Sequence, residues 1–195
     1  MGQPGICLSI RTGMVLPGQN GGRSGISALA VVAYRLSLNC DKPIRMSIYK
    51  MAASKRIALV AHDNKKKELI EWAIYNKSVL AKHRLFATGT TGKMLEKAIG
   101  ISITKFMSGP LGGDQQIGAR IAERKIDVLI FFWDPMEAQP HDPDIKALLR
   151  LGVVWNIPFA CDRSTADFLL TSPLMHQDYD VIQPDYSLYL KRPDR

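Results

Sequence analysis

Short apolar runs alternate with amphipathic segments through most of the chain after residue 55. The runs at 57–61, 85–87, 101–107, 127–133 and 157–161 predict strands, and 180–184 is expected to be extended. Helices are predicted over about 64–82, 93–98, 114–124, 145–153 and 165–170. Continuous apolar strands that alternate with helices are typical of a parallel sheet covered on both faces. The pattern therefore predicts a single three-layer, doubly wound α/β domain with a mainly parallel five-stranded sheet.

The first 52 residues follow a different pattern. Residues 17–25 are rich in Gly, Ser and Pro, and no sustained helical or strand period follows them. We interpret residues 1–52 as a poorly ordered N-terminal extension and residues 53–195 as the folded domain, with Met51 as an alternative start. The apolar stretch 26–34 lies far from the start of the chain and has no convincing cleavage site after it, so secretion is not favoured.

Charge and cysteine content narrow the function classes. The net charge is +8, but residues 1–50 carry six Lys or Arg against Asp41 alone, which leaves only +3 for the rest. Nucleic-acid binding is therefore not favoured for the domain. No apolar run approaches the roughly 18 residues that a membrane span requires. The three cysteines form no CxxC pair, which favours a reducing, cytoplasmic compartment.

Polar clusters follow several of the predicted strands, and ligands in this fold class bind at the carboxyl ends of the strands. The loop 88–92, Thr-Gly-Thr-Thr-Gly, joins a strand to a helix. Its hydroxyls and its helix N-terminus favour a monophosphate cradle, with a tight turn and threonine cap as the alternative. Lys66, four residues after His62, lies where its ammonium group could reach a phosphate, although surface exposure is its default interpretation.

A glycine-rich turn, 108–113, ends in Asp114. Ser108 and the N–H of Gly109 could donate to an anion, and Asp114 is either a helix cap or a general base beside a carbonyl compound. His141 lies close to two acids that could orient its ring. Metal binding is a competing interpretation of the histidines, and it is disfavoured because no ligand pair has the fixed spacing of a metal motif.

From about 55 to 190 the chain resembles methylglyoxal synthases. The resemblance is carried by ordered strings, among them Ala-His-Asp at 61–63, Ala-Thr-Gly-Thr-Thr-Gly at 87–92, Ser-Gly-Pro-Leu-Gly-Gly-Asp-Gln-Gln at 108–116, Phe-Phe-Trp-Asp-Pro at 131–135 and Pro-His-Asp-Pro-Asp at 140–144. It implies conversion of dihydroxyacetone phosphate to methylglyoxal and inorganic phosphate, with phosphate as a candidate regulator. It also implies a homohexamer with no metal and no organic cofactor.

The same resemblance implies a role for each matching residue. Asp114 would be the catalytic base and acid, and His141 would contact a substrate oxygen. Support for the site would come from Asp63, Asp134 and Asp144. The residues that would hold the substrate, mainly through its phosphate, are His62, Lys66, Thr88, Gly89, Thr90, Thr91, Ser108 and Gly109.

Two other functions fit the same pattern. A phosphate-sensing regulatory domain, like the allosteric domain of carbamoyl phosphate synthetase, would have the cradle but no need of a base at Asp114 or of His141. A triose phosphate isomerase activity would share the enediolate and would differ in its product. The lyase outcome rests on the resemblance, because the sequence does not reveal how the scissile bond is aligned.

Overall fold

A five-stranded parallel sheet forms the centre of the fold. The computed structural model describes residues 46–137, 142–184 and 186. The strand order is β4-β3-β2-β5-β6, and every neighbouring pair is parallel. The predicted α/β class with a parallel five-stranded sheet is confirmed. The strands are β2 (Arg56–Ala61), β3 (Arg84–Ala87), β4 (Ile103–Lys105), β5 (Val128–Phe132) and β6 (Phe159–Ala160).

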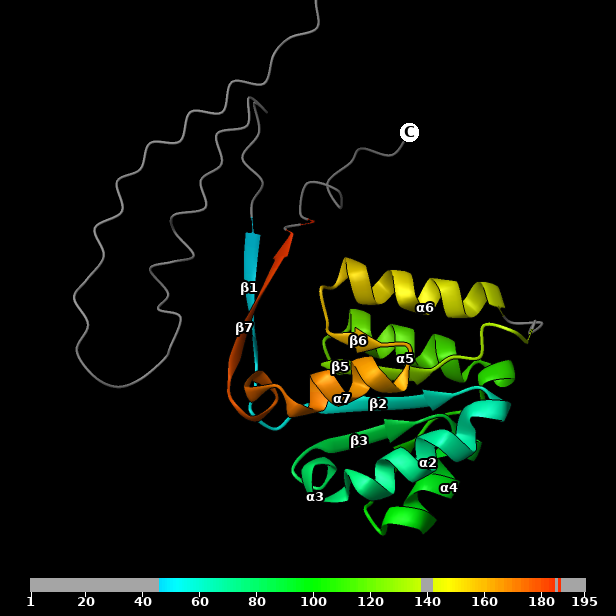
Figure 1. Cartoon of the computed structure of the whole chain (residues 1–195). Helices are drawn as coiled ribbons and strands as arrows, with labels where there is room; N and C mark the ends of the chain where they lie inside the picture. The colour runs from blue at the N-terminus through cyan, green and yellow to red at the C-terminus, as the bar shows by residue number, and fades with distance from the viewer. Residues whose placement is uncertain (1–45, 138–141, 185, 187–195) are drawn as a thin grey trace, which may run out of the picture. The chain divides into compact units, whose positions relative to one another are not determined.

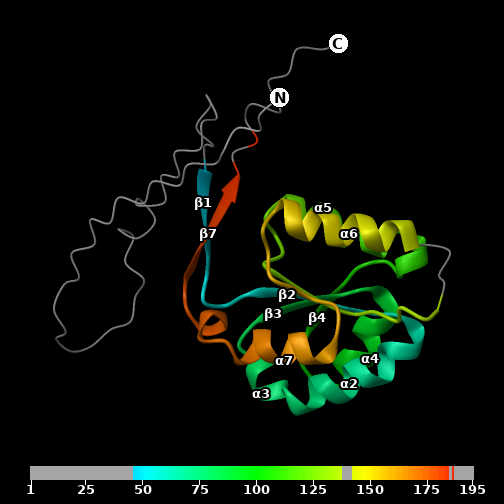
Figure 2. The same cartoon turned by 45° about the horizontal axis from the view of Figure 1, so that its top comes forward.

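Helices cover both faces of this sheet (Figure 1). One layer contains α2 (Lys66–Tyr75), α3 (Lys77–Leu80), α4 (Gly89–Ile99) and α7 (Arg163–Thr171), and the other contains α5 (Gly113–Ala122) and α6 (Asp142–Val154). The two layers separate clearly in Figure 2. Alternate residues of β2 and β5 enter two buried apolar clusters, one on each face. In the part of the chain that the structure describes, no helix has the length and hydropathy to cross a membrane.

Several helix boundaries differ from the prediction, and two of them show why. The predicted helix 64–82 is divided at Asn76 into α2 and α3, and the Asn76 side chain donates to the Trp72 carbonyl oxygen at 3.0 Å. A side chain that competes for backbone acceptors favours such a break. Helix α4 begins at Gly89 rather than near residue 93. Glycine and threonine are poor helix formers, and tertiary packing overrides their propensity here.

Residues 46–51 also differ from the prediction, which places them in the irregular extension. They form β1 (Met46–Met51), which pairs antiparallel with β7 (Tyr179–Pro184) from Met46 opposite Pro184 to Met51 opposite Tyr179. The partner strand lies about 130 residues further along the chain, so local sequence gave no indication of the pairing. The rest of the expected extension, residues 1–45, lies outside the described residues.

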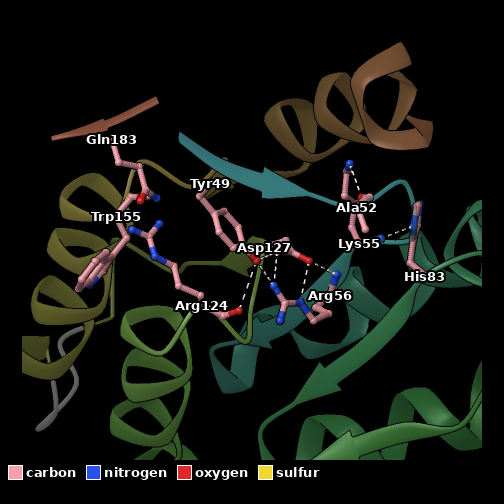
Figure 3. A network of polar contacts seen from close by, with 9 residues as sticks. All are labelled: Tyr49, Ala52, Lys55, Arg56, His83, Arg124, Asp127, Trp155 and Gln183. Carbon is pink, nitrogen blue, oxygen red and sulfur yellow. Dashed lines mark hydrogen bonds and ion pairs between the residues drawn. The ribbon is translucent and has the colours of Figure 1, made fainter. Parts of the chain in front are cut away.

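A polar network joins the β1–β7 ribbon to the start of the sheet (Figure 3). The buried Asp127 carboxylate accepts hydrogen bonds from the backbone N–H and guanidinium of Arg56, at 2.7 to 2.9 Å, and from the Tyr49 hydroxyl at 3.3 Å. The guanidinium of Arg124 lies over the Tyr49 ring at 5.0 Å and over the Trp155 ring at 4.6 Å. Removing Arg56 would leave the buried Asp127 charge unpaired, and Tyr49 is the ribbon residue that bonds to this pair.

Another buried group at this end of the sheet is His83. Its Nδ1 accepts a hydrogen bond from the Lys55 backbone N–H at 3.2 Å, and its ring stacks on His176 with 5.7 Å between centroids. Burial of the ring, together with the positive charges of His176, Lys55 and Lys82, lowers the pKa of His83 from 6.5 to about 4. The folded protein therefore favours the neutral imidazole.

We predict an acid-sensitive stability from this histidine. Well above pH 6.5 the ring is neutral in both states. As the pH falls through 6.5 toward 4, only the unfolded chain takes up the proton, and stability is lost. The loss between pH 7 and pH 5 should be about 2 kcal/mol. Urea unfolding at the two pH values measures it, and in His83→Asn the loss should be smaller by that amount. An equal loss in wild type and variant would contradict the assignment.

Candidate active site

A cavity of about 220 Å³ opens where β2, β3 and β5 end. It lies at the carboxyl edge of the parallel sheet, where this fold class binds ligands. Nine of the predicted site residues line it, and they come from three separate segments of the chain. They are His62, Asp63, Lys66, Thr88, Thr90, Thr91, Ser108, Gly109 and Asp114.

The threonine turn supplies one wall of the cavity. Thr88 is the N-cap residue of α4, but its side chain makes no capping hydrogen bond to the helix. Its hydroxyl instead lies 3.4 Å from the Thr91 hydroxyl, and Thr90 and Thr91 belong to the first turn of the helix. Backbone N–H groups in a first turn lack intrahelical acceptors and carry the positive end of the helix dipole. This wall therefore favours an anion.

The neighbouring turn from Ser108 to Asp114 supplies another part of the wall. Two backbone bonds close it, from Leu111 N–H and Gly113 N–H to the Ser108 carbonyl oxygen, at 3.0 and 2.9 Å. Gly112 then adopts a left-handed φ of 96°, and α5 starts at once with Asp114 in its first turn. The Asp114 carboxyl is buried and packs against Gly109, where a Cβ atom would come within 2.9 Å of its Oδ2.

His62 is held in one tautomer beside these walls. The backbone N–H of Asp134 donates to His62 Nδ1 at 3.2 Å, so the neutral ring carries its proton on Nε2. The ring is buried and meets the Phe131 ring edge-on, with 5.1 Å between centroids. A side chain fixed by a hydrogen bond and a ring contact loses little freedom when it binds a ligand.

Lys66 is the lysine among the described residues that line the cavity. It is the first residue of α2, and its ammonium group lies 2.5 Å from the Asp63 carboxylate. The Lys66 side chain is only 19% exposed, whereas Asp63 is 83% exposed. A lysine that lines a cavity and is shielded from solvent interacts with an anion more strongly than a lysine on the surface.

The structure does not bring every predicted residue to the cavity wall. Gly89 does not line the cavity; its N–H donates to the Met107 carbonyl oxygen at 3.0 Å, and a Cβ would lie 3.1 Å from the Phe106 carbonyl oxygen. Its position favours close packing of the turn. Asp144 lies in the first turn of α6 and does not line the cavity, and the predicted His141 lies outside the described residues.

Asp134 does not line the cavity either, and its carboxylate bonds to neighbouring residues. Its carboxylate accepts from the Met136 N–H at 3.1 Å and from the Asn64 amide at 3.3 Å, and these bonds hold the pKa of Asp134 below its ordinary value. It therefore stays ionised and links the loop after β5 to the loop after β2. This position agrees with a supporting role, which remains a prediction.

Four lining residues were not predicted: Val60, Ala61, Pro110 and Phe131. Three of them are apolar residues near the ends of β2 and β5, and the sequence identified them only as strand interior. They come just before the polar residues at the strand ends, and this position could have identified them from the sequence. They give the cavity an apolar floor beneath its polar walls.

The arrangement defines a class of site. A buried carboxylate, a neutral imidazole, a shielded ammonium and a helix N-terminus surround a cavity of triose size, on a doubly wound α/β domain.

Residues 68–161 match the family model of the MGS-like domain. The chain is 60% identical to a methylglyoxal synthase of Coxiella burnetii over 138 residues, which are 71% of this chain and 96% of that protein.

Two further relatives agree. A methylglyoxal synthase of Proteus mirabilis is 59% identical over 141 residues, which are 72% of this chain and 93% of that protein. The crystal structure of methylglyoxal synthase from Elizabethkingia anophelis NUHP1 superposes with a TM-score of 0.73 at 57% identity, covering 76% of this chain and 98% of that one. The chain belongs to the methylglyoxal synthase family.

Proposed function

We propose that this chain is a lyase that converts dihydroxyacetone phosphate to methylglyoxal and inorganic phosphate. The observation that carries the proposal is that Asp114 and the threonine turn line one cavity, in a chain 60% identical to a methylglyoxal synthase. The regulatory-domain alternative has no support from the relatives, and a sensor has no use for a buried carboxylate beside its anion site. The substrate is thus a small phosphorylated ketone.

The first step assigned to this cavity is proton transfer. The Asp114 carboxylate takes a proton from the hydroxymethyl carbon next to the ketone, and the electron pair moves to the ketone oxygen to give an enediolate. A donor that is already in place stabilises the negative charge as it develops on that oxygen. The neutral His62, with its proton on Nε2, can donate in this way. The resemblance assigns the same kind of contact to His141, which lies outside the described residues.

The second step is elimination. As the remaining hydroxyl passes its proton to the departing phosphate, the electrons form a new carbonyl and a new carbon–carbon double bond, and the carbon–oxygen bond to the phosphate breaks. The resulting enolate takes up a proton on its terminal carbon and becomes methylglyoxal. Atoms balance without water or a redox partner. Lys66, the α4 N-terminus and Ser108 would stabilise the departing phosphate dianion.

Product analysis tests this proposal. The purified chain is incubated with dihydroxyacetone phosphate and a metal chelator, and free phosphate, dicarbonyl and glyceraldehyde 3-phosphate are assayed. The proposal predicts equal amounts of phosphate and methylglyoxal. Glyceraldehyde 3-phosphate without free phosphate would indicate an isomerase, and substrate binding without turnover would indicate a sensor; either result would contradict the proposal.

Lys66→Met should weaken substrate binding more than it slows turnover at saturation. The ammonium group is expected to contact the phosphate in both the substrate and the transition state, so its loss removes uniform binding. A hydrogen bond to a charged group contributes about 1.5–3 kcal/mol, so KM should rise roughly 10- to 100-fold. Lys67→Met, at the exposed neighbouring position, is the matched control and should leave KM unchanged. Equal KM values for the two variants would remove Lys66 from the phosphate site.

We further propose, from the resemblance to the family, that the protein is a cytoplasmic homohexamer that needs neither metal nor organic cofactor. The sparse cysteines favour a reducing compartment. Inorganic phosphate is the product and a candidate regulator.

A further inference from the structure

A second cavity, of about 250 Å³, lies on the α5 side of the sheet. Phe86 of β3, Thr104 of β4 and Phe106 form part of its lining. Arg56 and Arg84, the first residues of β2 and β3, lie at its other end. We call this cavity the basic pocket. It shares no lining residue with the cavity that contains Asp114.

Positive charge exceeds negative charge around the basic pocket. Its four cations are Arg56, Arg84, Arg120 and Lys125. Two carboxylates pair with three of them: Asp127 with Arg56 at 2.7 Å, and Glu123 with Arg120 at 3.1 Å and with Lys125 at 2.9 Å. Within residues 46–137 and 142–184, Arg84 has no ion pair. The formal surplus is therefore two positive charges, which matches a phosphate monoester dianion.

Arg56 is a donor already fixed in place at this pocket. Asp127 holds its Nε and Nη2 groups, and Nη2 also donates to the Tyr49 hydroxyl (Figure 3). Nη1 has no protein partner among the described residues, and the side chain is 24% exposed. A guanidinium held in this way presents planar donors that suit a phosphate or a carboxylate.

The pocket also has an aromatic wall. The Phe86 and Phe106 rings lie almost parallel, with 6.0 Å between centroids and 14° between planes, and both residues are half-buried. Apolar ring surface bordered by arginines favours a ligand with a flat apolar group joined to an anion. Two copies of this face brought together would oppose two like surpluses of positive charge, which disfavours symmetric self-association here.

We propose that the basic pocket binds an aromatic phosphate monoester, its phosphate on Arg84 and Arg56 and its flat group on the two phenylalanine rings. The proposal does not depend on the lyase activity. A short stretch of chain connects the basic pocket to the candidate active site, because Phe106 lines the basic pocket and Ser108 lines the active-site cavity.

Phenyl phosphate is the probe for this proposal, titrated calorimetrically into the full chain in its native assembly. The Lys66→Met background weakens the phosphate cradle of the other cavity, so that binding there does not mask the basic pocket. Saturable binding in this background is expected, with inorganic phosphate and benzyl alcohol each binding more weakly. No binding in this background would overturn the proposal, and this is also the outcome if another subunit covers the pocket.

Arg84→Gln should weaken phenyl phosphate binding at least about tenfold, which corresponds to 1.4 kcal/mol. Arg150→Gln removes an exposed arginine of α6 outside the pocket and should leave binding unchanged. Equal affinity in the two variants would overturn the proposal. Turnover of dihydroxyacetone phosphate should stay normal in Arg84→Gln, so failure of this inference and failure of the proposed lyase activity are distinguishable.

Discussion

Asp114→Asn is expected to lower kcat by roughly 10²- to 10⁴-fold, because a positioned general base contributes about that much to the rate. The amide has the shape of the carboxyl group, so the variant can keep the packing of Asp114 against Gly109. It cannot accept a proton from carbon. Turnover measured at saturating substrate reports the loss directly, since the step removed is chemical rather than a binding step.

Phosphate binding should survive the same substitution. The Asp114 carboxylate lines the same cavity as the phosphate cradle, so its negative charge opposes a bound dianion. Phosphate affinity in Asp114→Asn should therefore equal or exceed that of the wild type. Asp180→Asn, at an exposed position on β7, is the matched control and should affect neither quantity. Near-normal kcat in Asp114→Asn would show that another group is the base.

Gly113→Ala is expected to cost at least about 2 kcal/mol of stability and most of the activity. A Cβ atom at this position would lie 2.1 Å from the Met107 carbonyl oxygen and 2.9 Å from its carbonyl carbon. Both are backbone atoms, so the turn itself must move. The turn carries both Ser108 and Asp114, and a displacement of about 1 Å can cost a hundredfold in rate.

Gly118→Ala, on the same helix, is the control that separates the steric clash at position 113 from a change in helix propensity. There the new Cβ would meet the end of the Leu151 side chain, at 2.8 Å from Cδ1, and that side chain can rotate away. Alanine also favours the helix over glycine, so the change should be close to neutral. Thermal unfolding and kcat of the two variants provide the comparison. Similar behaviour of Gly113→Ala and Gly118→Ala would contradict the close-packing argument.

Much of the fold could be predicted from apolar periodicity. The run 127–133 is continuously apolar after Asp127, and the structure places β5 at Val128–Phe132. Boundaries were harder where tertiary contacts outweigh local preference, as at the start of α4. β1 was missed because its strand character depends on β7 and on the contacts of Tyr49 with Asp127, both distant in sequence.

In the candidate site, too, some features could be predicted from the sequence pattern and others depend on contacts between distant residues. Parallel strand topology is enough to gather His62, Thr88 and Asp114 at one edge, because each lies just beyond a buried strand or its turn. Finer geometry could not be predicted. The Nε2 tautomer of His62 depends on the peptide N–H of Asp134, and the need for glycine at 113 depends on the Met107 carbonyl. These are contacts between separate segments, which no local pattern encodes.

Exchange of carbon-bound hydrogen in D₂O tests most directly whether the carboxyl group beside the phosphate cradle takes the substrate proton. Dihydroxyacetone phosphate is incubated with wild-type protein and with Asp114→Asn, and ¹H and ³¹P NMR follow deuterium uptake and phosphate release. We expect the wild type to release phosphate and form deuterium-containing methylglyoxal, whereas the variant should give neither elimination nor exchange. Deuterium uptake or phosphate release by the variant at a rate close to wild-type turnover would contradict the account, and so would intact phosphate ester with the wild type.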